Sequence, residues 1–238
     1  MFFIRAPSLG RAHELIIKKI IKDGERIITE DGEVTLELPE PSNIHVATPL
    51  ASPMISPNCM FGPKAMEKYV YDFFEGSNGS FAYTYRDRIM FYPQHKIDDK
   101  GSRVMFFEYD QIEGIIEKLK KNPQSRRAQA ITWIPAIDLE AKEPPCLQRM
   151  QFFIRDGKLN MYVEFRSNDM LSALGANMYL MANIQKHIAD RLEINEGWYS
   201  HTSVSSHIYY LRDIEELKKF EPTEVEQFLA SLKTAISE

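Results

Sequence analysis

The spacing of apolar side chains predicts several helices along the chain. Within residues 11–22, apolar positions recur at the period of a helix with one buried face. A second apolar stripe follows Asp110 and Glu113, a pair that resembles a capping box. The predicted helices comprise residues 11–22, residues 63–75, a segment that begins at 110, residues 170–193, and a last helix opened by Thr223 and Glu226.

Other segments alternate between apolar and polar residues or are rich in aromatic side chains, and these predict strands. Two hairpins are expected around the turn dipeptides Asp31-Gly32 and Asp156-Gly157. The predicted strands comprise residues 26–29, 34–38, much of 81–109, 127–133, 151–154, 159–166 and 198–211. Residues 40–64 are rich in proline and show no clear period, so we expect irregular chain there. Because strands and helices are mixed without regular alternation, the pattern favours an α+β fold in a single domain over residues 1–238.

Composition and charge exclude several classes of function. Hydrophobic residues make up 44% of the chain and charged residues 26%, as in ordinary globular proteins. The net charge of −5 gives no general attraction to nucleic acid or to an anionic membrane, so we expect neither partner. No apolar run approaches the roughly 20 residues that span a bilayer, and the N-terminus lacks the profile of a signal peptide.

The two cysteines, Cys59 and Cys146, lie far apart and outside any paired metal-ligand spacing. Free thiols in a reducing cytoplasm are the simplest interpretation, and we expect no metal. Cys146 follows Pro144 and Pro145, which restrict the backbone and can hold its thiol on a rigid turn. A thiol attacks only as a thiolate, so a catalytic cysteine needs a cationic or hydrogen-bonding neighbourhood. Taken alone, such a cysteine is more often a buried core residue.

Arginines at the ends of predicted strands are candidates for phosphate binding. Arg166 with Ser167, and Arg126 with Arg127, stand where side chains often line a ligand cleft. The guanidinium fork matches phosphate oxygens in geometry and charge. Before any resemblance is considered, a solvated rim explains these arginines at least as well.

Three further polar residues in the second half suit ligand recognition. His207 and Tyr209 are two residues apart on a predicted strand and should point to one face, which suits hydroxyl recognition. A satisfied pair in the core explains them about as well. Asn177 lies in an otherwise apolar helix, where a buried amide must find partners, and structural hydrogen bonding is the simpler reading.

Taken in order, these motifs resemble the signature of the thymidylate synthases. The resembling segments are Pro144-Pro145-Cys146, Gln151-Phe152-Phe153, Arg166 through Asp169, Asn177 and His207-Ile208-Tyr209, with Asp110-Gln111-Ile112, Ser125 through Arg127 and Trp133 upstream of them. Each motif is common by itself, whereas the ordered set is specific. It covers residues 110–213, somewhat under half the chain, and its divergent character is similar to that of short archaeal members.

The resemblance implies that Cys146 is the nucleophile that adds to C6 of the uracil ring of dUMP. Arg166 and Ser167 would hold the phosphate, and Arg166 would also favour the thiolate. His207 and Tyr209 would bind the 3′-hydroxyl of the deoxyribose.

The same resemblance implies that Asn177 reads the O4/N3 edge of uracil and that Gln151 orders the nucleotide site. Asp169 matches a residue hydrogen-bonded to the pterin and its water network. Arg126 and Arg127 match arginines that reach the phosphate from the partner subunit. A homodimer with shared active sites follows, formed through the face of a mixed β-sheet packed with helices.

The chain also departs from the family pattern. Leu147 stands where the family has a histidine, and Tyr69 falls at the place of the catalytic glutamate. The tyrosine that helps to remove the C5 proton is Tyr83, given Arg88 five residues later, although Tyr85 remains open.

Two further departures concern the phosphate and the one-carbon donor. The arginine-glycine phosphate loop has no counterpart, and Arg26 is the candidate substitute. The chain ends at Glu238, short of the usual C-terminal lid, so we expect an altered lid. The donor expected from the resemblance is 5,10-methylene-tetrahydrofolate or a modified pterin such as methylene-tetrahydromethanopterin.

Three hypotheses about function follow. The leading one is methylation of dUMP to dTMP. A deoxypyrimidine-nucleotide hydroxymethylase is the enzymatic alternative, although relatives that act on cytosine carry Asp at the position of Asn177. A non-catalytic nucleotide-binding protein is the third, and it would leave a cysteine at the C6-attack position unexplained.

Overall fold

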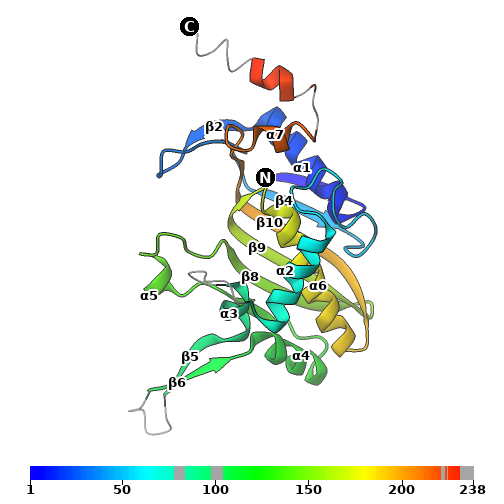
Figure 1. Ribbon diagram of the computed structural model, residues 1–238. Coiled ribbons are helices and arrows are strands. Elements are labelled where there is room, and N and C mark those ends of the chain that lie inside the picture. The colour runs from blue at the N-terminus through cyan, green and yellow to red at the C-terminus, as the bar shows by residue number, and fades with distance from the viewer. Residues whose placement is uncertain (78–83, 98–103, 221–222, 224, 231–238) are drawn as a thin grey trace.

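A mixed sheet lies at the centre of the molecule (Figure 1). The computed structural model describes residues 1–77, 84–97, 104–220, 223 and 225–230, and within them the sheet has eight strands. Its strands are β1 (Phe2–Ala6), β2 (Glu25–Ile28), β3 (Val34–Glu37), β4 (Ser42–Val46), β7 (Gln129–Ile131), β8 (Leu147–Arg155), β9 (Lys158–Asp169) and β10 (Asn195–Ile208). The main path runs in the order β1, β4, β10, β9, β8, β7. Strand pairs β1–β4 and β9–β10 are parallel, and the other pairs on this path are antiparallel, which confirms the predicted mixed sheet.

Helices cover one face of this sheet. Helix α1 (Leu9–Asp23) and helix α6 (Leu174–Arg191) contact the central strands and each other. Helix α2 (Pro63–Glu75) packs on α6, and helix α4 (Gln111–Lys121) packs beside β7. The apolar character of α6 has a direct cause, because eleven of its residues, among them Met178 and Met181, are buried between the sheet and its neighbours.

Local signals in the sequence explain where these elements begin and end. The Ser8 hydroxyl accepts from the Arg11 N–H at the start of α1, and α2 begins at Pro63. At the end of α2, Gly76 has φ +97°, a conformation that favours glycine. The β8–β9 hairpin turns at Asp156 and Gly157, both with positive φ, as a two-residue turn of the type that twisted strands require.

The structure corrects the predicted elements in four places. Residues 40–64 contain β4, which pairs with β1 and β10, so tertiary pairing overrides the weak local pattern. The segment 81–109 contains helix α3 (Tyr85–Met90), opened by a Thr84–Asp87 capping box, besides the paired strands β5 (Tyr92–Ile97) and β6 (Val104–Tyr109). Short helices α5 (Pro135–Asp138) and α7 (Ile214–Leu217) were not expected.

The fourth correction concerns Glu113. Asp110 caps α4 as predicted, but the Glu113 carboxylate pairs with Arg191 of α6 rather than completing a capping box. Residues 223 and 225–230 are helical, as the last predicted helix requires, and Thr223 lies within the helix rather than before it.

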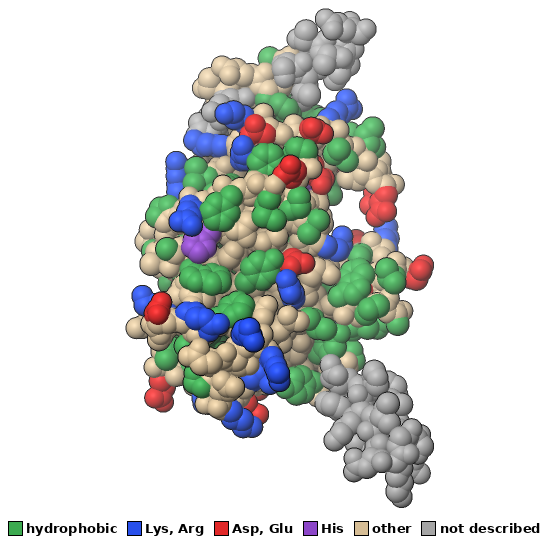
Figure 2. Space-filling view, turned by 180° about the vertical axis from the view of Figure 1, so that it is seen from behind, with side chains coloured by type: hydrophobic (Ala, Val, Ile, Leu, Met, Phe, Trp, Pro, Cys, Tyr) green, Lys and Arg blue, Asp and Glu red, His purple; other side chains and the backbone are tan. Residues whose placement is uncertain are grey.

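The other face of the sheet carries a mixture of large apolar and charged side chains. Phe3, Ile131 and Val204 expose apolar side chains on it, and Arg149 lies over the Tyr162 ring while pairing with Glu164. Figure 2 views the molecule from the side opposite the helices and shows hydrophobic and basic side chains intermingled there.

Candidate active site

Cys146 lies in a pocket of about 810 Å³ that opens at the ends of β9 and β10. The walls come from the β2–β3 hairpin, the segment 138–144, the start of α6, and α2. The structure brings most of the predicted site residues together here. The predicted residues that line the pocket are Cys146, Arg166, Ser167, Asp169, Asn177, His207 and Tyr209.

The backbone around Cys146 is held from several sides. The Cys146 carbonyl accepts from the Arg166 N–H on β9 at 2.9 Å. The next peptide is also pinned, because the Leu147 N–H donates to the Tyr85 hydroxyl at 3.4 Å and the Leu147 carbonyl accepts from the Thr132 hydroxyl. Cys146 therefore lies directly before β8, on backbone that is hydrogen-bonded to Arg166, Tyr85 and Thr132.

Arg166 faces this strand end with its guanidinium group. Its Nη2 donates to the Pro144 carbonyl at 2.8 Å, and its Nε donates to the Pro145 carbonyl at 3.1 Å. Burial raises the pKa of the Cys146 thiol, and the positive charge of Arg166 lowers it in part. Arg166 therefore orders the turn at Pro144 and Pro145 through its hydrogen bonds. Its positive charge also favours the thiolate form of Cys146.

His207 and Tyr209 form a polar wall at the end of β10. Their ring centroids lie 5.2 Å apart in an edge-to-face arrangement, and His207 Nδ1 is 3.1 Å from the Ser205 hydroxyl. Burial lowers the pKa of His207, so its ring is neutral at pH 7. A neutral imidazole beside a phenol can both donate to and accept from a sugar hydroxyl.

Asp169 lines the pocket, but its carboxylate is already engaged. Oδ1 accepts from the Leu171 and Ser172 N–H groups, each at 3.1 Å, and Oδ2 accepts from the Ser172 hydroxyl at 2.6 Å and from Arg212 at 2.8 Å. A carboxylate has about four lone-pair sites, and four donors occupy them. In this conformation Asp169 orders the turn before α6, and a pterin contact would have to displace a donor.

Four predicted residues lie elsewhere. Arg126 and Arg127 are exposed and line a separate surface pocket with Lys118 and Lys121 of α4. Gln151 donates to the Arg126 carbonyl at 3.0 Å instead of facing Cys146. Arg26, the candidate substitute for the phosphate loop, is exposed on β2 and does not line the main pocket.

Tyr83 and Tyr85 are the two tyrosines that the sequence offers for removal of the C5 proton. Tyr83 lies outside the described residues. Tyr85, at the start of α3, lines the same pocket as Cys146, as does Tyr69 of α2. Within the segment Tyr83-Thr84-Tyr85, the capping box at Thr84 is the signal that would have put Tyr85 on a helix facing the pocket.

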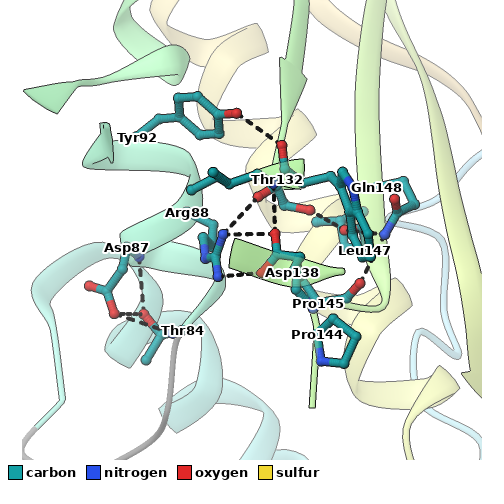
Figure 3. Close-up of polar contacts among 12 residues, drawn as sticks. Thr84, Asp87, Arg88, Tyr92, Thr132, Asp138, Pro144, Pro145, Leu147 and Gln148 are labelled. Atoms are coloured by element: carbon teal, nitrogen blue, oxygen red, sulfur yellow. Dashed lines mark hydrogen bonds and ion pairs between the residues drawn. The ribbon is translucent and has the colours of Figure 1, made fainter. Parts of the chain in front are cut away.

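An ion pair that the sequence did not suggest supports the wall of the pocket (Figure 3). Arg88 of α3 donates to both carboxylate oxygens of Asp138, at 2.7 and 3.0 Å, and to the Thr132 carbonyl at 3.3 Å. Asp138 also accepts from the Ile134 N–H at 2.6 Å, and its side chain has no solvent exposure. Helix α3 also carries Tyr85, and Thr132 is hydrogen-bonded to Leu147. The buried Arg88–Asp138 pair therefore connects the element that bears Tyr85 to the backbone next to Cys146.

The charge of the pocket is unfavourable for an anion. Glu30, Asp31 and Glu37 of the hairpin face it from one side, and Glu140 and Glu143 from another. The cationic residues that line it are Lys142 and Arg166. A nucleotide phosphate would therefore need further positive charge from outside this set.

Among the described residues, no group of three or more His, Cys, Asp or Glu side chains is arranged to hold a metal ion. None of the helices in that part of the chain is long and apolar enough to cross a membrane.

Comparison with known proteins gives consistent matches. The family model described as "Thymidylate synthase" matches residues 66–234. A Methanocaldococcus jannaschii protein named "Putative thymidylate synthase" is 38% identical over 227 residues, which cover 93% of this chain and 97% of that protein. A protein of the same name from Methanosarcina mazei is 35% identical over 207 residues, which cover 87% of this chain and 88% of that protein.

Proposed function

Because the chain belongs to the thymidylate synthase family, we propose that it methylates dUMP to dTMP with Cys146 as the nucleophile. The thiolate adds to C6 of the uracil ring, and the electron pair of the C5–C6 bond moves toward O4, which makes C5 nucleophilic. C5 then bonds to the one-carbon unit and loses its proton to a base in the pocket. The bond between Cys146 and C6 breaks when the product leaves.

The observation that carries this proposal is the shared pocket. Cys146 stands beside Arg166 at one end of it, and Asn177, His207 and Tyr209 line the same space. These are the side chains that thiol addition, base reading and sugar recognition require. We favour Tyr85 over Tyr83 for removal of the C5 proton, because Tyr85 lines the pocket that holds Cys146 and its hydroxyl lies 3.4 Å from the Leu147 backbone nitrogen, next to the nucleophile.

A reduced pterin would supply the one-carbon unit and the hydride that completes the methyl group. Tyr69, Tyr85 and Trp133 line the pocket and offer flat apolar surfaces against which such a ring can stack. Asp169 matches the residue that contacts the pterin in the family, and in this chain its acceptor sites are engaged by Leu171, Ser172 and Arg212. Both 5,10-methylene-tetrahydrofolate and methylene-tetrahydromethanopterin are therefore candidates to be tested.

We also propose that the active protein is a homodimer formed through the open face of the sheet. Arg126 and Arg127 are exposed and remote from their own chain's pocket, while that pocket is rich in carboxylates. Two arginines from a partner would provide the missing positive charge for the phosphate. The exposed apolar side chains Phe3, Ile131 and Val204 would be buried in such an interface.

The test is release of tritium from [5-³H]dUMP, measured without a donor and with each of the two pterins. Donor-dependent release with formation of dTMP supports methylation and identifies the donor. Formation of a hydroxymethyl product instead would indicate that water replaces hydride. Binding of dUMP with no release under any condition would show a non-catalytic nucleotide-binding protein.

A further inference from the structure

A second thiol lies outside the main pocket, beside the first turn of α6. Cys59 is half-buried in the loop before α2, and its neighbours Pro57 and Phe61 are exposed, so small solutes can reach this loop. Cys59 Sγ lies 2.8 Å from the point where a Cβ on Gly175 would stand, and His13 Nδ1 of α1 lies 3.2 Å from the same point. A side chain at 175 would press on both groups, so the glycine allows them to lie close to each other.

The position of the hydrogen on the His13 ring follows from its hydrogen bond. Nε2 lies 2.8 Å from the Met170 carbonyl oxygen, which can only accept, so Nε2 carries the hydrogen. Burial lowers the pKa of His13 to about 4, so the ring is neutral at pH 7 and Nδ1 is a bare acceptor. His13 is 1% exposed, and no described residue donates to Nδ1. An unpaired buried acceptor is uncommon in native proteins and calls for an explanation.

The surroundings of Cys59 act on its thiolate in both directions. Burial raises the pKa of the thiol, and the nearby Glu216 carboxylate raises it further, whereas the backbone N–H groups of Phe61 and Met60 lower it. Sγ also packs against Gly175 in the first turn of α6, where the positive end of an 18-residue helix lies. The N–H groups and the helix end favour the thiolate, which is the form that attacks an electrophile.

We propose that Cys59 is a site of oxidation by hydroperoxides, and that His13 Nδ1 accepts a hydrogen bond from the sulfenic acid formed there. In the reduced protein, no hydrogen bond joins the thiol to Nδ1. An oxygen atom added to Sγ would bring an O–H donor beside Nδ1, because both groups face the same point at Gly175. The unpaired acceptor is therefore satisfied by the oxidised side chain.

The oxidation consumes one hydroperoxide for each thiol. The sulfur of Cys59 attacks the terminal peroxide oxygen, an S–O bond forms, and the O–O bond breaks. Sulfur loses two electrons, and the peroxide is reduced to an alcohol, or to water if it is hydrogen peroxide. The leaving oxygen takes up the thiol proton. The transferred oxygen keeps its own hydrogen and donates it to His13 Nδ1 in a hydrogen bond.

The experiment uses the full chain with Cys146→Ser, in which Cys59 is the one remaining thiol. The measured quantity is a ratio of two rate constants at pH 7, oxidation by hydrogen peroxide over alkylation by methyl iodide. Oxidation is followed by capture of the sulfenic acid with dimedone and by the mass of the intact protein. Methyl iodide reports the amount and the accessibility of the thiolate, because a methyl group brings no donor to Nδ1.

Two variants remove the contact between Nδ1 and the oxidised sulfur in different ways. In His13→Gln, the amide nitrogen can still donate to the Met170 carbonyl, but no acceptor stands at the place of Nδ1. The ratio should fall roughly three- to tenfold, the value of one hydrogen bond. Gly175→Ala keeps His13 and forces it apart from Cys59, so the ratio should fall even if His13→Gln does not fold. Gly62→Ala is the matched control and should keep the ratio, because its Cβ would meet no atom within 4 Å.

A dimedone adduct on Cys59 and a lower ratio in the folded His13→Gln or Gly175→Ala protein would support the proposal. Absence of the adduct would overturn it. A ratio that stays constant in every folded variant would also overturn it, because His13 would then act on access to the thiol rather than on the oxidised sulfur. These measurements use neither dUMP nor a pterin, so their outcome is independent of the proposed function.

Discussion

At the scale of single residues, the reactivity of Cys146 depends on two opposing effects. Burial disfavours its thiolate, and the guanidinium of Arg166 favours it. Cys59 is a useful contrast, because burial raises its pKa too, while the groups that oppose this effect are the backbone N–H groups of Phe61 and Met60 rather than an arginine. The two thiols therefore differ in electrostatic environment rather than in burial.

Cys146→Ser should abolish dehalogenation of 5-bromo-dUMP and leave dUMP binding largely intact. Dehalogenation needs thiolate addition to C6 but no one-carbon donor, so it isolates the nucleophile. The readout is bromide release together with the dissociation constant for dUMP. Cys59→Ser is the control and should retain activity; undiminished turnover by Cys146→Ser would remove Cys146 from the mechanism.

Arg166→Ala should move the pH profile of Cys146 alkylation to higher pH. Loss of the cation removes the effect that lowers the pKa of the thiol, while the effect of burial stays. The measurement is the rate of reaction with iodoacetamide against pH in a Cys59→Ser background. Arg212→Ala, which removes a charge held by Asp169 and Asp213, should leave the midpoint unchanged. An unmoved midpoint in Arg166→Ala would mean that Arg166 does not act on the thiol.

At the scale of elements, the Arg88–Asp138 pair connects α3 to α5 and to the strand end that bears Cys146 (Figure 3). The Asp138 side chain is fully buried and that of Arg88 is 12% exposed. A buried ion pair adds little to the stability of the fold when compared with well-packed apolar side chains in its place. Removing one partner alone is destabilising, because it leaves an uncompensated buried charge.

Arg88→Ala should therefore lower the free energy of unfolding by about 3–5 kcal/mol, measured by urea denaturation. The Lys186–Asp190 pair on the exposed side of α6 offers the control, and Lys186→Ala should leave stability nearly unchanged. Equal effects of the two substitutions would show that the buried pair does not hold these elements together.

Much of the element pattern could be predicted because its signals are local. Helix α2 was predicted at its observed bounds from Pro63 and Gly76, and the β8–β9 hairpin from its turn dipeptide. Strand β4 and helix α3 were missed, since the first depends on pairing with β1 and β10 and the second on a short capping box inside an aromatic segment.

The residues of the pocket and its surroundings also fall into those that the sequence motifs identified and those that they did not. The ordered motifs identified seven residues that line one pocket, because the spacing of a family's motifs carries its tertiary arrangement. They gave no role to Asp138, Asn168 or His201, although Asn168 lies within one of the motifs. In the structure these three side chains hydrogen-bond to other residues of the chain, and no local pattern distinguishes them from ordinary polar residues.

At the scale of the whole molecule, the charge of the pocket and the apolar side chains exposed on the open face of the sheet are the basis of the proposed homodimer. Residues from near both ends of the described chain, from Ile4 to Val225, belong to one hydrophobic core. The pocket is rich in carboxylates, and Arg126 and Arg127 are exposed and do not line it. In the proposed two-fold dimer, each chain would offer its two arginines to the pocket of its partner.

Mixing Arg126→Ala with Arg166→Ala should restore activity that neither protein has alone. If Arg126 acts on the partner's phosphate, a mixed dimer contains one site with both arginines and one site with neither. Random exchange then gives about a quarter of the wild-type number of sites. The measurement is tritium release from [5-³H]dUMP after mixing, with subunit exchange followed by labelled chains. Lys186→Ala mixed with Arg166→Ala should keep about half of the wild-type number of sites before and after exchange, and so controls for effects of mixing other than exchange. If chains exchange and the Arg126→Ala mixture stays inactive, Arg126 serves its own subunit or no phosphate, because a trans contribution must be recovered in the mixed dimer.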